Sequence, residues 1–451
     1  MKSLLRTAAL RARASVAPAR GRIVTTRGFA SSGGEPIKTA LYDFHVSRGG
    51  TMVEFAGHCL PAVYKDFTLS QSHRFTRVQT SLFDVSHMVQ HIFSGSQAAT
   101  FLEHVTPSSW RSTPMMQGKL TTLLWPSGGI VDDAVVTRLT GDKFYAVTNG
   151  ACREKDIDYF KSQLETFPGR NSVDWRVLDG KALVALQGPG AAMVLGDALY
   201  PGDDGKAPID LEKLYFGGAA WARLKLVDGS ASPQEILISR GGYTGEDGFE
   251  LSFGAGSQDG ESEPGGSFNV ATSVVEGMLQ QAGPKRLRPA GLGARDSLRL
   301  EAGMCLYGQD LDDTTTPAEA GLGWVVSPDR RTGGGGFLGA DIVIPQLKPR
   351  SKGGLGVSRK RVGLIVGQGP PARAGAELWH QGRKVGTVTS GMPSPTLGRN
   401  IAMGYVEDGL HKADTQLEAL VRGKMLSAVV TKMPFVPTRY YKPPPEEKKE
   451  R

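Results

Sequence analysis

Short apolar runs alternate with turn-forming residues through most of the chain, and the spacing within each run distinguishes strands from helices. Two apolar runs flank a polar turn at 140–143 and predict a β-hairpin over 130–149. Apolar residues between Ile157 and Phe167 instead recur every three or four positions, which predicts an amphipathic helix. A further helix is predicted over 292–301. The chain therefore mixes helices with strands.

The pattern changes after Arg361, where six short strand-like runs follow one another with only turns between them. The pair Gln381-Gly382, between two of these runs, suits a tight hairpin turn. Short strands at regular spacing, without intervening helices, predict a small closed β-barrel.

Segments poor in apolar residues divide the chain. Residues 254–267 have almost no apolar content and indicate a flexible surface insertion, whereas 347–360 combine glycines with basic residues and indicate a linker. We therefore expect a main region over 33–346, a barrel domain over 361–442 and a disordered tail over 443–451.

The N-terminal 32 residues differ in charge from the rest of the chain. They contain seven Lys and Arg residues, no acid, and many Ala, Ser and Thr residues. Such a composition is typical of an organellar transit peptide, and Arg6, Arg11 and Arg13 interrupt the continuous apolar core that a secretory signal needs. Residues 1–32 are therefore expected to form a mitochondrial transit peptide, with a disordered basic tail as the alternative.

Setting that segment aside changes the meaning of the net charge. The whole chain carries +8, of which seven charges belong to residues 1–32, so the remainder carries only +1. A nearly neutral body gives little reason to expect nucleic-acid binding. The three cysteines are odd in number and argue against a disulfide scaffold. The sequence contains no P-loop, no GxGxxG after a strand and no GxSxG elbow.

His87 and His91 are a candidate metal-binding pair, since a spacing of four suits two ligands on one helix. They are predicted to lie in one strand, however, where four residues span about 13 Å. That distance is too long for one ion, so no metal site is expected.

Asp132 and Asp133 interrupt an apolar strand, where carboxylates are costly to bury without partners. Adjacent strand residues point to opposite faces, so one of the two can be exposed while the other enters a cavity. A pair at the surface or at a turn is the alternative.

Two further charged residues could bind a polar ligand. Glu250 alternates with apolar neighbours in a predicted strand and could accept two N–H bonds from a flat heterocycle, although it could also lie on a solvated strand edge. Arg295 begins a predicted helix and could bind a carboxylate through two bonds. One of the helix arginines could instead pair with Asp296 or Glu301.

Taken together, these segments resemble the glycine cleavage T-protein family of aminomethyltransferases. The matching stretches follow the family's order over nearly all of residues 41–441. They are LYDFHVSRGGTMVEFAG (41–57), SLFDVSHM (81–88), GGIVDDAVV (128–136), ALQGP (185–189), GYTGEDGFE (242–250), ARDSLRLEAGMCLYGQDL (294–311), GTVTSGMPSPTLGRNIAMGYV (386–406) and KMPFVPTRYY (432–441). The pair His58-Cys59 and the length of 254–267 depart from the family's pattern.

The resemblance implies an α+β fold shaped as a three-lobed ring. Two lobes are ferredoxin-like folate-binding units that exchange strands, the third is the C-terminal β-barrel, and tetrahydrofolate would lie in the central hole. Asp133 would be the catalytic residue beside the folate N5/N10 region, and Glu250 would bind the pterin N–H groups. The other implied folate-binding positions are Met88, Leu120, Val147, Asn149, Arg295 and Tyr440.

The implied reaction transfers the one-carbon unit of an aminomethyl group from the lipoyl arm of the H-protein to tetrahydrofolate. Its products are 5,10-methylenetetrahydrofolate, ammonia and dihydrolipoyl H-protein. The implied partners are the lipoylated H-protein and the other glycine cleavage subunits in the mitochondrial matrix, with no nucleic acid, membrane or metal.

Two other functions remain open at this point: a folate-binding repair or RNA-maintenance protein on the same fold, and a non-enzymatic scaffold for an acidic partner. A group of basic residues near the Gly-rich joint at 330–336 could dock an acidic H-protein or could merely keep a linker solvated. These residues are Arg330, Arg331, Lys348, Arg350, Lys352, Lys360 and Arg361.

Overall fold

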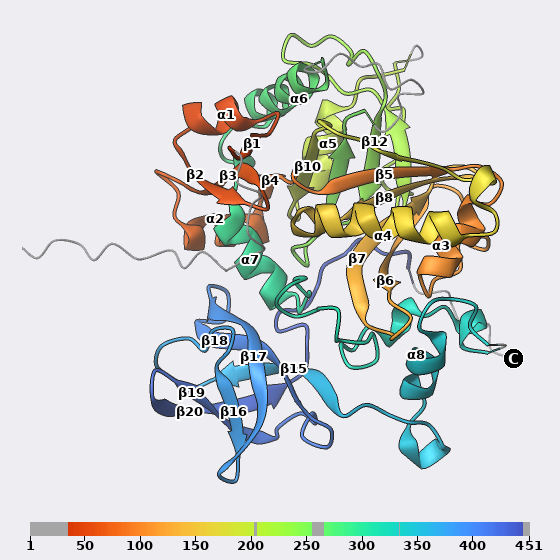
Figure 1. Ribbon diagram of the computed structural model, residues 1–451. Coiled ribbons are helices and arrows are strands. Elements are labelled where there is room, and N and C mark those ends of the chain that lie inside the picture. The colour runs from red at the N-terminus through yellow and green to blue at the C-terminus, as the bar shows by residue number, and fades with distance from the viewer. Residues whose placement is uncertain (1–34, 203–204, 255–265, 333, 445–451) are drawn as a thin grey trace, which may run out of the picture.

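The computed structural model describes residues 35–202, 205–254, 266–332 and 334–444. The expected transit peptide, most of the expected insertion and most of the expected tail lie outside these ranges. Within them, helices pack on mixed sheets and a separate closed barrel follows, which confirms the α+β class with a C-terminal β-barrel (Figure 1). No helix in the described ranges is both long enough and apolar enough to cross a bilayer.

Two large sheets form the main body, in the orders β6-β7-β8-β5-β9 and β11-β12-β13-β10-β4-β14. Their strands are β4 (Thr80–Asp84), β5 (Val89–Ser94), β6 (Gln117–Leu124), β7 (Ile130–Arg138), β8 (Lys143–Thr148), β9 (Asp174–Val177), β10 (Leu183–Gln187), β11 (Ala219–Ala222), β12 (Ile236–Arg240), β13 (Gly248–Ser252) and β14 (Leu287–Pro289). Because β4 and β5 are consecutive but lie in different sheets, the chain crosses between the sheets after Asp84. A small sheet of β1 (Ile37–Lys38), β2 (Gly50–Phe55) and β3 (His58–Tyr64) lies beside them.

Helices cover the outer faces of both large sheets. On the five-stranded sheet, α3 (Ala98–Val105) and α4 (Arg153–Thr166) bury an aromatic core in which the Phe93 and Phe160 rings lie 5.1 Å apart. On the six-stranded sheet, α5 (Ala191–Ala198) and α6 (Gly266–Ala282) bury an aliphatic core. A third apolar cluster, including Phe83, Tyr145 and Leu183, joins the inner faces of the two sheets. The sheets therefore face each other.

The barrel contains all six strands that the C-terminal pattern predicted. In chain order they are β15 (Arg359–Val366), β16 (Glu377–His380), β17 (Arg383–Ser394), β18 (Arg399–Glu407), β19 (Gln416–Val421) and β20 (Lys424–Thr431). The turn between β16 and β17 places Gln381 and Gly382 at φ 50° and 76°. Positive φ at both central residues is what a type I′ hairpin turn requires, so this prediction is also confirmed.

α7 (Leu292–Glu301) connects the body to the barrel through buried charges. Arg299 donates a 2.7 Å hydrogen bond to Asp310 and a 3.0 Å bond to Ser390 of β17. Glu301 accepts hydrogen bonds of 2.7 Å from Arg77 and from Thr396. Both bounds of the helix agree with its prediction.

Two helices near the start of the body were not predicted: α1 (Tyr42–Ser47) and α2 (Leu69–Val78). The sequence did contain a signal for α2, since Thr68 and Gln71 form a capping box, each side chain bonding the other residue's backbone N–H. The helix α8 (Ala340–Leu347) follows the Gly-rich joint.

Candidate active site

Asp133 lies on the inner face of the five-stranded sheet and Asp132 on the outer face, as strand alternation predicts. Asp132 is fully buried, whereas Asp133 is partly accessible. Next to Asp133 on the inner face, Val135 stands between Leu120 of β6 and Val147 of β8 in one cross-strand row. Val135 is 40 % exposed although β7 is an interior strand, so packing does not fully cover this part of the face.

Asn149 connects the two aspartates from the residue just after β8. Its side-chain Nδ2 donates to Asp132 Oδ1 at 2.8 Å and to Asp133 Oδ1 at 2.9 Å. Its backbone N–H donates to Asp132 Oδ2 at 2.9 Å. Both oxygens of Asp132 and one oxygen of Asp133 are thereby engaged.

Glu250 lies on the second sheet, in β13, between Ala185 of β10 and Ser239 of β12. The alternative of a solvated strand edge is therefore wrong, because β13 is an interior strand. The neighbouring acids Glu246 and Asp247 form ion pairs with Arg77 and Arg240 at 2.8 and 2.5 Å. Glu250 has no ion pair within the described ranges.

Arg295 does not pair with the acids of its own helix. Asp296 pairs with Arg299 at 2.8 Å, and Glu301 pairs with Arg77 at 2.7 Å. The Arg295 guanidinium lies 4.7 Å from the centre of the Tyr243 ring, and its charge acts on both Glu250 and Asp133. Among the described residues it has no ion pair, so its donors are available to a ligand.

Burial dominates the electrostatics of this group. It raises the pKa of Asp133 to about 7, assisted by the charge of Asp132 and opposed by the Asn149 hydrogen bond and by Arg295. Burial also raises the pKa of Glu250, and Arg295 opposes that shift. A carboxyl group with a pKa near neutrality can hold or release a proton under physiological conditions.

The structure connects four predicted residues, Asp133, Asn149, Glu250 and Arg295, through hydrogen bonds and charge, and Leu120 and Val147 flank them on the sheet. Met88 precedes β5, packs on the apolar cluster between the sheets and borders a cavity of about 260 Å³. Tyr440 instead packs on Phe216 with ring centres 4.4 Å apart, and its charged neighbours are Arg77 and Glu246.

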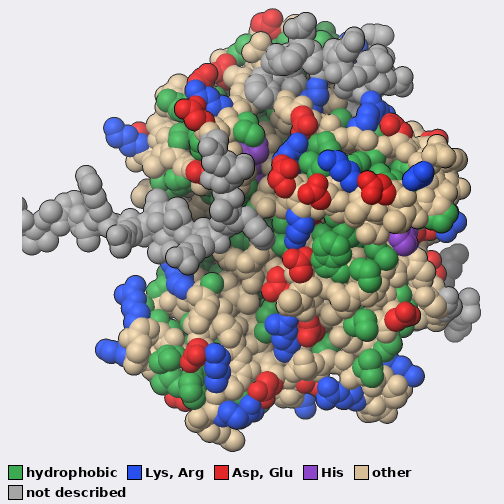
Figure 2. All heavy atoms as spheres, in the orientation of Figure 1, with side chains coloured by type: hydrophobic (Ala, Val, Ile, Leu, Met, Phe, Trp, Pro, Cys, Tyr) green, Lys and Arg blue, Asp and Glu red, His purple; other side chains and the backbone are tan. Residues whose placement is uncertain are grey.

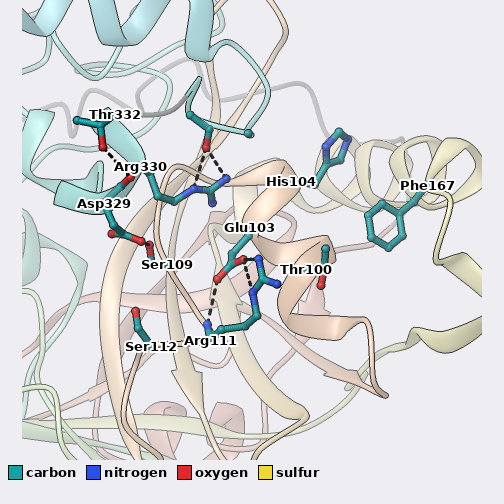
Figure 3. A pocket seen from close by; sticks show the side chains of 12 residues that line it. Thr100, Glu103, His104, Ser109, Arg111, Ser112, Phe167, Asp329, Arg330 and Thr332 are labelled. Atoms are coloured by element: carbon teal, nitrogen blue, oxygen red, sulfur yellow. Dashed lines mark hydrogen bonds and ion pairs between the residues drawn. The ribbon is translucent and has the colours of Figure 1, made fainter.

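A larger cavity of about 490 Å³ opens elsewhere, between α3 and the Gly-rich joint (Figure 3). Its charged lining is largely paired, since Arg111 contacts Glu103 at 2.6 Å and Arg330 donates to the Gly335 carbonyl. None of the residues expected to bind folate lines it.

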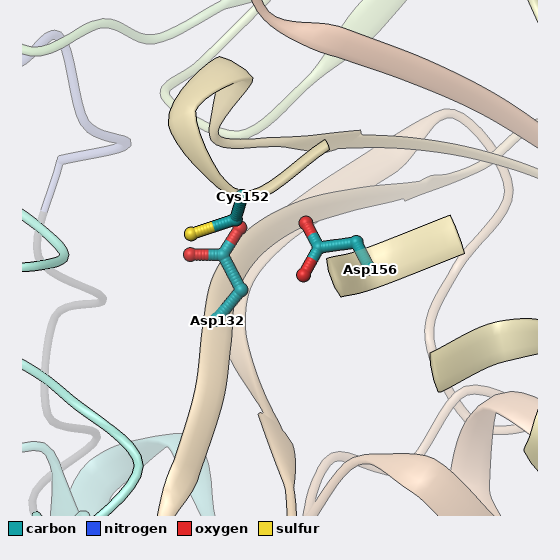
Figure 4. A group of neighbouring side chains, drawn as sticks. All are labelled: Asp132, Cys152 and Asp156. Atoms are coloured by element: carbon teal, nitrogen blue, oxygen red, sulfur yellow. The ribbon is translucent and has the colours of Figure 1, made fainter. Parts of the chain in front are cut away.

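Among the residues that the structure describes, one group of donor atoms is close enough to contact a single ion: Asp132, Cys152 and Asp156, all within 4.8 Å of one another and all buried (Figure 4). Asn149 already occupies both Asp132 oxygens, and burial raises the pKa of the Cys152 thiol, which keeps it neutral. His87 lies before β5 and not in the strand with His91, so that detail of the prediction was wrong.

Sequence reasoning missed two residues of this region. Tyr243 lies in the Gly-rich loop that precedes Glu250, and Asp156 is, by sequence, an ordinary acid in the first turn of a helix. No local pattern distinguishes such an acid from the solvated ones that commonly begin helices.

Comparison with known proteins identifies the family of the chain. The GCVT N-terminal domain matches residues 41–330, and the glycine cleavage T-protein C-terminal barrel domain matches residues 359–437. A probable mitochondrial aminomethyltransferase of Schizosaccharomyces pombe is 43% identical over 405 residues, covering 90% of this chain and 94% of that protein. The mitochondrial aminomethyltransferase of Pisum sativum is 43% identical over 424 residues, covering 94% of each chain.

A solved structure shows the same architecture. The glycine cleavage system aminomethyltransferase T of Bartonella henselae superposes with a TM-score of 0.76 at 33% identity, covering 90% of this chain and all of that one. Family domains, relatives and structure thus agree over most of the chain, which belongs to the glycine cleavage T-protein family of aminomethyltransferases.

Proposed function

We propose that this mitochondrial aminomethyltransferase uses the group around Asp133 to transfer a one-carbon unit from the aminomethylated lipoyl arm of the H-protein to tetrahydrofolate. In that reaction folate nitrogens bond to the methylene carbon, its bonds to sulfur and to the amino nitrogen break, and the two folate N–H protons pass to the thiol and to ammonia. The main support for this proposal is that Asp133 and Asn149 on one sheet face Glu250 on the other. The positive charge of Arg295 opposes the rise in the pKa of both acids that burial causes.

The two acids suit different parts of a folate. Glu250 has no ion pair among the described residues, so its carboxylate can accept two N–H bonds from the pterin ring. The apolar row of Leu120, Val135 and Val147 offers a flat surface for that ring. Arg295 can bind a carboxylate or a ring oxygen through two donors.

Asp133 is the residue nearest to the chemistry in this proposal. Its free oxygen can orient the folate nitrogens and stabilise the positive charge that develops on them as the methylene unit arrives. The surrounding sheets limit access of water, which would otherwise hydrolyse the reactive one-carbon fragment. Asp133 needs no metal for this role, and none is part of the proposal.

The proposed partners are the lipoylated H-protein and the other glycine cleavage subunits in the matrix, without nucleic acid or membrane. Four of the seven candidate docking cations donate to backbone carbonyls and so help to hold their own surroundings in place: Arg330, Arg331, Arg350 and Arg361. Figure 2 shows Lys and Arg side chains scattered among acids on the visible face. A docking contribution is therefore assigned to Lys348, Lys352 and Lys360.

The test measures ammonia released from aminomethylated H-protein with and without tetrahydrofolate, beside a calorimetric titration of tetrahydrofolate alone. The proposal expects folate binding and folate-stimulated ammonia release. A scaffold protein would show neither, and a folate-binding repair protein would bind folate without releasing ammonia.

A further inference from the structure

Asp132 and Asp156 form a buried acid pair behind the proposed site. Asp132 projects from the outer face of β7, and Asp156 projects toward it from the first turn of α4 (Figure 4). Both side chains are fully buried. Their oxygens lie within 4.8 Å of each other. Two carboxylates this close in a protein interior cannot both be ionised without a large energetic cost.

The hydrogen bonds decide which member of the pair carries the charge. Asp132 accepts two N–H bonds from Asn149, which favour its ionised form. Asp156 lies near the Thr148 hydroxyl, but neither of its oxygens has a partner of full hydrogen-bond geometry among the described residues. The geometry therefore favours the negative charge on Asp132 and the proton on Asp156. Burial raises the pKa of both groups, consistent with one shared proton.

Asn149 transmits this arrangement to the site. Both hydrogens of its Nδ2 are used, one on Asp132 and one on Asp133. The opposite orientation of the amide would place its oxygen against carboxylate oxygens, so an ionised Asp132 permits only one orientation. The amide oxygen is then left to accept from a ligand, and Asp133 is held by one oxygen while the other stays available.

We propose that the Asp132–Asp156 pair, sharing one proton, is a positioning device that sets the orientation of Asn149 and, through it, of Asp133. The inference rests on the proposed function, because Asp133 is placed at the reacting folate nitrogens there. Loss of the Asp156 proton would set two buried anions against each other and displace Asp132 from its two hydrogen bonds with Asn149. Turnover would then fall at alkaline pH.

Several titratable or charged groups face the pair from the elements around it and contribute to its pH dependence. They are Asp133 on β7, Cys152 before α4, Lys155 and Tyr159 on α4, and Tyr307 from the segment after α7. Asp313 and Arg295 act on two of these groups, Tyr307 and Asp133. Lys155 is engaged with Tyr307 and with Asp313 at 3.3 Å, so it does not neutralise the pair directly.

The experiment compares Asp156→Asn and Asp156→Ala with the exposed control Asp158→Asn on the same helix. Asparagine imitates the protonated acid and can still donate to Asp132, whereas alanine cannot. We expect kcat at pH 7 to fall about twofold in Asp156→Asn and about tenfold in Asp156→Ala, the scale of one lost hydrogen bond to a charged group. Asp158→Asn should match the wild type.

The pH profile of kcat from pH 6 to 9 separates positioning from a general structural role. The wild type and Asp158→Asn should lose activity toward alkaline pH, and Asp156→Asn should not. Difference infrared spectra should show the carbonyl stretch of a neutral carboxylic acid at neutral pH, absent in Asp156→Asn. The inference would be overturned if kcat of Asp156→Asn declined at alkaline pH as in the wild type, or if the infrared band were absent from the wild type. It would also be overturned if the wild type bound one divalent metal tightly per chain and Asp156→Asn abolished that binding.

Failure of this inference is distinct from failure of the proposed function. A wild type that binds no tetrahydrofolate and releases no ammonia rejects the function itself. A wild type that does both, with Asp156 variants that behave like Asp158→Asn, rejects only the positioning pair.

Discussion

The buried acid at the contact between body and barrel, Glu301, contrasts with the acids behind the candidate site. At this contact, Glu301 accepts hydrogen bonds from His73, Ser394 and Thr396, which together hold its pKa at about 2 despite burial. Behind the site, Asp132 and Asp156 are equally buried but have no cation as a direct partner among the described residues, and burial raises the pKa of Asp156 to about 7.

The difference shows what each group does for the molecule. A buried carboxylate with a full set of donors connects elements from distant parts of the chain, as Glu301 connects α7 with α2 and the barrel. A buried carboxylate without such donors destabilises the fold when ionised, so its presence calls for a role other than stability. Substitutions and pH changes can test each side of this contrast.

Arg77→Ala should have the largest effect, because it leaves Glu246 and Glu301 buried without their shared cation. We expect a loss of about 3–5 kcal/mol in the free energy of unfolding, the usual result of removing one partner of a buried ion pair. Chemical denaturation measures it, with the exposed Arg74→Ala on the same helix as control. A loss no larger than that of the control would show that the contact between body and barrel does not depend on this charge.

The two groups should respond to pH in opposite directions. The lowered pKa of Glu301 gives stability that is present above its unfolded pKa and is lost as the pH falls toward 2. The raised pKa of Asp156 gives stability that is present below its unfolded pKa and is lost as the pH rises to about 7.

Asp156→Asn should therefore remove a decline in wild-type stability between about pH 4 and 7, of the order of 2–4 kcal/mol. Denaturant titrations at several pH values measure this, with Asp158→Asn as the matched control. If the free energy of unfolding changed with pH in the same way in the wild type and in Asp156→Asn, Asp156 would already be ionised in the native protein at acid pH.

Glu250→Gln should act on binding and not on folding. The amide keeps one acceptor oxygen but loses the negative charge, so tetrahydrofolate affinity should weaken by about 1.5–3 kcal/mol. Isothermal titration measures the dissociation constant directly. An unchanged constant would show that this carboxylate does not contact the folate.

Asp133→Asn should reduce turnover about tenfold or more while the protein remains folded, as expected for the loss of a charge-stabilising group. Asp132→Asn should cost less, because Asp132 acts only through Asn149. Ammonia release under saturating folate compares the two. Greater damage from Asp132→Asn, with Asp133→Asn silent, would reverse the assigned roles of the neighbouring acids.

The smallest expected effect concerns the partner surface. Raising the salt concentration should weaken H-protein affinity a few-fold while leaving folate affinity nearly unchanged, since exposed charges are screened beyond about 8 Å at physiological ionic strength. Replacing Lys348, Lys352 and Lys360 together by Gln should remove that salt dependence. Equal salt sensitivity of the two affinities would argue against electrostatic docking.

The sequence by itself determined the local elements and the family. Strand runs, the I′ turn at Gln381-Gly382 and the stripe of α4 depend on neighbouring residues only, so they could be predicted from the order of side chains. Strand alternation likewise places Asp132 and Asp133 on opposite faces, because successive side chains of any strand point in opposite directions. Short helices such as α1 were missed because a single turn or two leaves too few positions to establish a period.

Only the tertiary structure decided which charges are paired. Arg295 and Arg299 lie one turn apart on the same helix, yet Asp310 and Asp296 engage Arg299 while Arg295 remains available to a ligand. Asp156 becomes part of the site only because α4 packs on the outer face of β7, opposite Asp132. Burial and charge pairing depend on residues distant in the chain, and for that reason local sequence could name the acids but could not tell which of them would carry a proton.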